Sequence, residues 1–174
     1  MTRDGVGDDP AFELWYREEF PRLVNTLAAA IGDRAVAEEA AAEACTRALE
    51  RWDRVGGLDR PGGWIYRVGL NDARRRLRRR DLEARLLRRH REPETVPTHE
   101  PDPELWAAVA ELGERTRTAV VLRFVADLTE PDIAQAMGVR RGTVATLLRR
   151  AMTTLERRLT PEADPTEELH VSHR

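Results

Sequence analysis

Apolar residues recur at steps of three and four positions through most of this 174-residue chain, and that spacing constrains the fold more than any other feature. Side chains spaced in this way share one face of an α-helix, whereas a β-strand needs strict alternation. The first apolar stripe runs over residues 12–31, where Pro21 is expected to break or kink the helix. A second stripe consists of Val36, Ala40, Ala44, Ala48 and Trp52. The spacing predicts an all-α fold.

A glycine-rich interval follows the second stripe. Residues 55–63 contain four glycines and a proline, which favour turns over regular structure, so we expect a loop there. A third helix is predicted from Trp64, with Ile65 and Val68 also facing inward. Its outward side chains are predicted to be Arg67, Asn71, Arg74, Arg75 and Arg78. These helices make up the first expected domain, residues 11–81.

Prolines and acids dominate the middle of the chain. Residues 92–103 hold four prolines in twelve positions, and proline both removes a backbone donor and blocks a helix interior. We therefore expect residues 82–103 to form a stiff acidic linker that leads to a second domain over residues 104–160. With its early part helical and the rest extended, this linker reaches about 55 Å. Two domains joined in this way could touch separate sites on DNA.

The second domain has the spacing of a helix-turn-helix. Thr129 is placed to cap a supporting helix whose inner face includes Ile133 and Met137. Gly138 marks the turn, and Val139 is expected to be a buried plug. The inner face of the next helix is predicted to contain Val144, Leu148, Met152, Leu155 and Leu159. Its outer face is predicted to contain Arg140, Arg141, Thr143, Thr146, Arg149 and Arg150. Side chains there can enter a major groove, where arginine pairs with guanine edges or phosphates.

The formal net charge of −2 conceals blocks of opposite sign. Residues 67–91 hold eleven arginines and three acids, and residues 140–158 hold six arginines and one acid, so these blocks carry +8 and +5. The block 92–114 carries −7, and the tail from Thr160 carries −3. Two basic blocks on predicted helices create local fields that favour a nucleic acid partner. The alternative for each run is a solvated helix face laced with salt bridges.

Other functional classes find little support in the residues. No glycine-rich phosphate loop follows a strand and no nucleophile stands in a recognisable frame, so we expect no enzyme activity and no cofactor. Cys45 is the single cysteine and lies among alanines, which indicates a core residue. His170 and His173 lie near the end of the chain and are not expected to bind a metal. The chain has no apolar run of membrane length and its first residues lack a signal-peptide pattern, so a cytoplasmic protein is expected.

In their order, these parts resemble the extracytoplasmic-function (ECF) sigma factors of bacterial RNA polymerase, over about Phe12 to Leu159. One specific segment is GGWIYRVGLNDARRRLRRR, which is similar to the family's helix for melting and reading the minus-ten element. The other is LTEPDIAQAMGVRRGTVATLLRRAMTTLERRL, which is similar to its minus-thirty-five reader. The resemblance implies a transcription initiation factor whose partners are core RNA polymerase and promoter DNA, with an anti-sigma protein as a further partner class.

The resemblance also implies roles for single residues. Those placed along the opened minus-ten strand are Trp64, Arg67, Asn71, Arg74, Arg75 and Arg78, with the loop 55–63 near a flipped-out base. Those placed against the minus-thirty-five duplex are Arg140, Arg141, Thr143, Thr146, Arg149 and Arg150. Those placed against the polymerase clamp are Glu38, Glu39, Glu43 and Arg47.

Two alternatives remain open from the residues alone. One is a self-sufficient helix-turn-helix regulator, and the other is a degenerate sigma-like module that only binds a protein. The basic segment 64–80 distinguishes them from a sigma factor, because a helix of the melting type has no use in a simple repressor.

Overall fold

A computed structural model describes residues 9–58, 61–86 and 102–160 of the chain. Across these ranges the regular elements are all α-helices, which confirms the expected all-α fold with two small helical domains. The first domain contains α1 (Pro10–Ile31), α2 (Arg34–Leu49), α3 (Trp52–Val55) and α4 (Pro61–Leu86). The second domain contains α5 (Pro103–Ala110), α6 (Glu114–Phe124), α7 (Glu130–Met137) and α8 (Arg141–Leu159). Among the described helices, none combines the length and the apolar character that a membrane span requires.

Aspartates begin three of the helices. Asp9 accepts a hydrogen bond from the Ala11 amide at 2.8 Å, Asp33 accepts one from Val36 at 2.9 Å, and Asp102 accepts one from Leu105 at 3.0 Å. Each bond satisfies an amide that has no partner within its own helix. These side chains therefore set where α1, α2 and α5 begin.

The expected break at Pro21 is wrong, because α1 continues through this residue as one helix of 22 residues. Pro21 lies on the exposed side of α1, where water can satisfy the carbonyl that loses its amide donor. The expected loop 55–63 is also too long. Residues 52–55 form the short helix α3, and α4 begins at Pro61, an imide that suits a first helical turn. At its other end α4 runs on to Leu86, and residues 87–101 lie outside the described part.

Small side chains allow the helices of the first domain to pack closely. The inner face of α2 is almost entirely alanine, and its fully buried alanines are Ala37, Ala40, Ala41, Ala44 and Ala48. On α4, a Cβ placed on Gly69 would lie only 2.9 Å from Cδ1 of Leu27 in α1. Cys45 is 3% exposed, which confirms it as a core residue, and burial raises the pKa of its thiol to about 12.

The second domain has the expected helix-turn-helix, with differences in its inner face. Gly138 adopts the left-handed backbone (φ 65°) that ends α7 and turns the chain into α8. Val144 and Leu155 are buried as expected, but Met152 is 36% exposed and Val139 is only half-buried. Ala151 takes the fully buried position beside Met152, because the inner face of α8 is rotated by one residue at this turn.

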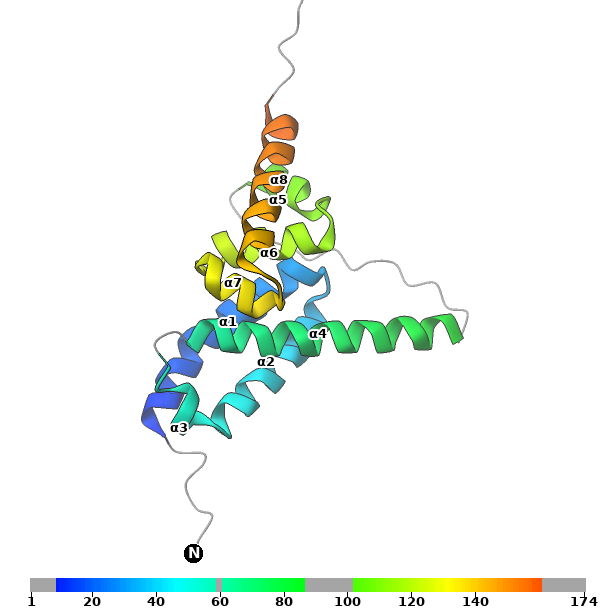
Figure 1. The fold of residues 1–174 in the computed structure, drawn as a ribbon. Helices are drawn as coiled ribbons and strands as arrows, with labels where there is room; N and C mark the ends of the chain where they lie inside the picture. The colour runs from blue at the N-terminus through cyan, green and yellow to red at the C-terminus, as the bar shows by residue number, and fades with distance from the viewer. Residues whose placement is uncertain (1–8, 59–60, 87–101, 161–174) are drawn as a thin grey trace, which may run out of the picture.

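The two domains pack against each other. The sequence predicts two domains joined by a linker and gives no sign of this contact. In Figure 1 the long helix α4 crosses the molecule, with α2 and α3 on one side and α5 to α8 on the other. The amino-terminal part of α4 contacts α7, and α1 contacts α6. A Cβ on Gly63 would lie 3.5 Å from Cβ of Asp132, and one on Gly62 would lie 3.4 Å from Cδ2 of Leu128. Buried residues of both domains form one continuous core.

Arg117 of α6 ties the second domain to α1. Its Nε donates to the Ala30 carbonyl at 3.0 Å, and its Nη1 donates to the Ala110 carbonyl at 2.8 Å. Both carbonyls lie in last turns of helices, where they have no intrahelical donor. One guanidinium thus caps a helix from each domain.

Candidate nucleic-acid interface

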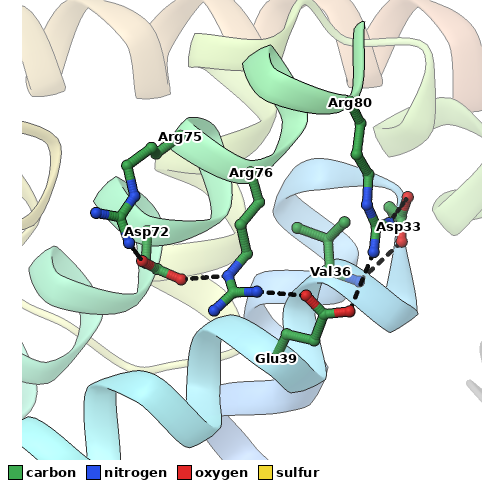
Figure 2. Close-up of polar contacts among 7 residues, drawn as sticks. All are labelled: Asp33, Val36, Glu39, Asp72, Arg75, Arg76 and Arg80. Atoms are coloured by element: carbon green, nitrogen blue, oxygen red, sulfur yellow. Dashed lines mark hydrogen bonds and ion pairs between the residues drawn. The ribbon is translucent and has the colours of Figure 1, made fainter. Parts of the chain in front are cut away.

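The arginine run of α4 is divided between intramolecular partners and free side chains, and two of the partnered arginines bind Asp72 (Figure 2). Asp72 has a side chain only 1% exposed. It accepts a hydrogen bond from Nη2 of Arg75 and another, at 2.5 Å, from Nε of Arg76. A carboxylate this deeply buried needs such partners, because burying an unpaired charge is costly. Arg75 and Arg76 therefore have a structural task in this arrangement.

Arg76 and Arg80 also bind α4 to α2, as Figure 2 shows. Arg76 donates Nη1 to Glu39, while Arg80 donates Nη2 to Glu39 at 3.1 Å and Nη1 to Asp33 at 3.4 Å. The hydrogen bond from Arg76 to Asp72, followed by the nearby charges, raises the pKa of the Arg76 guanidinium. Glu39 thus already has two partners on α4, although the sequence suggested that it faces the polymerase.

Arg74 points toward the second domain, contrary to the outward position expected for it. Its side chain is 21% exposed, and its Nε lies 3.3 Å from Oε1 of Glu114 in α6. The periodicity placed Arg74 on the outer face of an isolated helix. The second domain covers that face in the folded chain, and this could not be read from local spacing.

Among the α4 arginines whose side chains the structure describes, Arg67 and Arg78 remain free. Both are exposed, and neither makes an ion pair or a hydrogen bond to any side chain in the described ranges. Asn71, one helical turn after Arg67, is also exposed, and its side chain makes no hydrogen bond within the described ranges. The available polar groups of α4 are therefore far fewer than its arginine content indicates.

Trp64, Arg67 and Asn71 line one cavity between α2 and α4, of about 300 Å³. Val68 of α4 completes this wall, and the opposite wall consists of Arg47, Glu50 and Arg51 at the end of α2. We call this space the α2–α4 cavity. It combines an indole face and guanidinium groups, which can stack an unpaired base and hold its phosphates, with an amide and a carboxylate. The sequence reading did not include Glu50 and Arg51, because only the fold brings the end of α2 beside Trp64.

The residues expected to contact the polymerase lie along α2. Glu38 and Glu39 are exposed, whereas Glu43 and Arg47 are half-buried. Glu38 pairs with Arg34 at 3.0 Å, and Glu43 pairs with Arg47 at 2.8 Å. Arg47 thus stands at the border between this acidic face and the α2–α4 cavity.

The outer face of the helix-turn-helix carries the predicted cations at the surface. Arg140, Arg149 and Arg150 are exposed and make no ion pair within the described ranges. Arg141 is 72% exposed and lies 3.5 Å from Glu130 across the turn. The threonines differ, since Thr143 is exposed while Thr146 is half-buried and donates its hydroxyl to the Gly142 carbonyl at 2.9 Å. Three free guanidinium groups therefore lie along α8, with Arg140 at its N-cap and Arg149 and Arg150 near its middle.

A second cavity, which the sequence reading missed, lies between α5, α6 and α8. This apolar groove has a volume of about 460 Å³ and is lined by Leu105, Trp106, Val109, Val120, Phe124 and Met152, among others. Phe124 is 62% exposed. Large exposed apolar side chains in a groove mark a surface for binding another molecule. In the sequence, this groove could have been recognised from Phe124 and Val125, two apolar residues that lie outside the buried stripe of α6.

Some expectations concern residues that the structure does not describe. The acidic linker from residue 87 onward lies outside the described ranges, as do the tail with His170 and His173 and the first eight residues.

Comparison with known proteins identifies two regions. The family description "Sigma-70 region 2" matches residues 15–83, and "Sigma-70, region 4" matches residues 103–155. The first match covers α1 to α4, apart from the ends of α1 and α4, and the second covers α5 to α7 and most of α8. Together the two regions account for nearly all the described helices.

Several curated proteins are similar over most of their length. The chain is 26% identical over 156 residues to an RNA polymerase sigma-E factor of Streptomyces antibioticus, covering 88% of this chain and 87% of that protein. It is 29% identical over 127 residues to the RNA polymerase sigma factor SigV of Bacillus subtilis, covering 69% and 74%. It is 28% identical to the ECF RNA polymerase sigma factor BldN of Streptomyces coelicolor, covering 94% of this chain but only 66% of BldN.

One solved structure has the same arrangement of helices. It is the sigma factor RpoE of Bartonella quintana, solved in complex with the anti-sigma factor NepR. The similarity covers 85% of this chain and 96% of RpoE, with a TM-score of 0.71 at 19% sequence identity. At this identity the comparison demonstrates a shared fold.

Proposed function

Because the chain belongs to the sigma-70 family and is an RNA polymerase sigma factor of the ECF type, we propose that its two basic surfaces read the two elements of a promoter. The α2–α4 cavity receives the unpaired minus-ten strand, and the outer face of α8 receives the minus-thirty-five duplex. The observation that carries this proposal is the division of the α4 arginines into paired and free side chains. Arg67, the free arginine nearest Trp64, lines a cavity whose groups suit a nucleotide.

On the minus-ten side, we assign the first contacts to Trp64, Arg67 and Asn71. An indole plane can replace part of the stacking that a base loses on melting, a contribution of roughly 1–3 kcal/mol per base. Arg78 lies further along the same helix and extends the contact toward the flanking phosphates. Arg74 and Arg75 belong to the same proposed strand contact, and they become available as their partners Glu114 and Asp72 release them.

On the minus-thirty-five side, the proposed contacts are Arg140, Arg141, Thr143, Thr146, Arg149 and Arg150. Exposed guanidinium groups near the start of a recognition helix can reach guanine edges and phosphates in the major groove. The free state of Arg140, Arg149 and Arg150 supports this role, because no internal pair has to break first.

The two reading surfaces have to separate before both elements can be bound at once. The elements lie about 25 base pairs apart, roughly 85 Å of duplex at 3.4 Å per base pair. In the folded chain Gly63 nearly touches Asp132, and α7 is only 8 residues long, so Trp64 and Arg140 lie within a few tens of ångströms. The fifteen residues 87–101 can span about 55 Å when extended, which leaves room for the domains to part.

We assign polymerase binding to the exposed face of α2, with Glu38, Glu39, Glu43 and Arg47. An anti-sigma protein is a further proposed partner, supported by the complex in which the similar RpoE was solved. The proposed domain limits are residues 11–81 and 104–160, joined by a linker over 82–103. The chain acts through binding rather than catalysis, without a cofactor, and in the cytoplasm where polymerase and promoters meet.

The test is run-off transcription with core RNA polymerase on a promoter library. The expected result is a specific transcript that requires both the chain and the polymerase. A footprint obtained without polymerase would favour a self-sufficient regulator instead. No transcript from any template would contradict the proposal.

Single substitutions test the two DNA-binding surfaces separately. Arg67→Ala should reduce strand opening, measured by permanganate reactivity of unpaired thymines, while upstream duplex protection is retained. Arg149→Ala should reduce duplex protection first. Arg79→Ala is the matched control, because Arg79 is 82% exposed and pairs only with Glu83 on its own helix. Equal effects of all three variants would contradict the assignment of separate roles.

A further inference from the structure

Glu50 is an acid in a cavity that is otherwise lined by basic, polar and apolar side chains. It lines the α2–α4 cavity together with Arg47, Arg51 and Arg67. Within the described part of the chain, no hydrogen bond or ion pair engages the Glu50 side chain, and the same holds for Arg51 and Arg67. A carboxylate near three guanidinium groups normally pairs with one of them. Its free state leaves its oxygens available to a ligand.

The position of Glu50 on α2 gives no stabilising reason for an acid. Glu50 is the residue that ends α2, and its amide bonds to the Thr46 carbonyl at 3.0 Å. The carboxyl end of a helix carries partial negative charge, so an acidic side chain there is unfavourable and a basic one is preferred. The surrounding sequence offers Arg47 and Arg51 for that purpose. The acid therefore points to a role outside the stability of the helix.

The remaining groups of the cavity match the parts of an unpaired nucleotide. Trp64 and Val68 offer an apolar face for the base, and Arg51 and Arg67 can meet the phosphates on either side. The base edge is then left to Asn71 and Glu50, which stand on opposite walls. A carboxylate only accepts hydrogen bonds, so it favours an exocyclic amino group and repels a carbonyl oxygen.

We propose that Glu50 selects the base held in the α2–α4 cavity, by accepting a hydrogen bond from the exocyclic amine of cytosine, adenine or guanine, an amine that thymine lacks. Arg51 holds the adjacent phosphate. This assignment rests on the proposed reading of the unpaired minus-ten strand by the same cavity. It predicts that one position of that strand discriminates the amino-bearing bases from thymine.

The test compares wild-type holoenzyme with holoenzymes that carry Glu50→Gln, Glu50→Ala or Glu18→Gln. Glu18 is an exposed acid of α1 in the same domain that neither lines the cavity nor belongs to a proposed contact surface, which makes Glu18→Gln the matched control. The probes are promoter duplexes with a preformed bubble, in which each unpaired minus-ten position carries all four bases in turn. Equilibrium competition gives the relative affinities, so the measurement does not depend on transcription.

The wild type should bind templates with thymine at one position about tenfold more weakly than templates with cytosine, adenine or guanine there. Glu50→Gln should remove or invert that difference, because its amide can donate to a carbonyl of thymine, and Glu50→Ala should remove it. Glu18→Gln should keep it. An unchanged base profile in Glu50→Gln would overturn the assignment, and so would an equal loss of affinity for all four bases. If wild-type holoenzyme binds no bubble template, the proposed function fails together with this assignment.

Discussion

Substitution of Gly63 by leucine should push the two domains apart. A Cβ at this position would lie 3.3 Å from Oε1 of Gln135 and 3.5 Å from Cβ of Asp132, both on α7. The Gln135 side chain is exposed and can move aside, but Cβ of Asp132 is fixed to the α7 backbone. The further carbons of leucine therefore have no space while α4 and α7 stay in contact.

The magnitude follows from two opposing terms. Within an isolated α4, replacing glycine by leucine favours the helix by about 0.8 kcal/mol. Across the closed interface, the added carbons overpack the contact and cost about 1–3 kcal/mol. The equilibrium between packed and separated domains should therefore shift toward separation by about 5- to 150-fold, while the first domain itself is not destabilised.

The assay is a distance measurement between spin labels at Arg17→Cys on α1 and Arg157→Cys on α8, two exposed positions. The native Cys45 will not take a label, because it is 3% exposed and the pKa of its thiol is raised to about 12. Wild type should give one narrow distance distribution, and Gly63→Leu should add a broad population at longer distances.

The control is Gly113→Leu, because an added Cβ there meets no atom within 4 Å. This variant should keep the narrow distance. The reasoning is refuted if Gly63→Leu has the wild-type distance distribution, since the α4–α7 contact would then not hold the domains. It is equally refuted if Gly113→Leu separates the domains to the same extent.

Three further outcomes test the polar interior and the free cations. Asp72→Ala should lower the free energy of unfolding, measured in denaturant titrations, by about 1–3 kcal/mol. This is less than the cost of breaking a fully buried ion pair, because Arg75 and Arg76 keep access to water. A change below about 0.5 kcal/mol would contradict the structural role of Asp72. Burial raises the pKa of Glu19 above its ordinary value of 4.5, so the stability that this group contributes is present below that value and is lost as the pH rises through the raised pKa. The melting temperature of Glu19→Gln relative to wild type should therefore be higher at pH 7 than at pH 4, and an equal difference at both pH values would show that Glu19 does not titrate in this way. Arg67→Ala should reduce the slope of log affinity against log salt for holoenzyme on promoter DNA by about 1, whereas Arg76→Ala should leave it unchanged; equal slopes for the two variants would contradict the division of the α4 arginines.

The sequence determined the helices, because their signals are local. Apolar spacing located α1, α2 and α8, and Gly138 located the turn of the helix-turn-helix through its left-handed backbone. The resemblance to ECF sigma factors likewise came from continuous segments, and the matches to regions 2 and 4 confirm it. Local signals failed at Pro21, where position on the solvent side decided the outcome, and at Met152, where one step of helix rotation moved a side chain out of the core.

The tertiary structure alone decided which arginines are free. Charge counting gives one basic block over α4, but Asp72, Glu39 and Glu114 engage four of its guanidinium groups, and two of these three acids lie on other helices. The reading that the run is a face laced with salt bridges therefore holds for Arg75, Arg76 and Arg80. Pairing across 37 to 47 residues depends on how helices pack. Helix packing in turn depends on small residues such as Gly63 and Gly69, whose contact partners are far away in sequence. The composition of the α2–α4 cavity and the contact between the domains follow from the same packing, so both were decided by the fold.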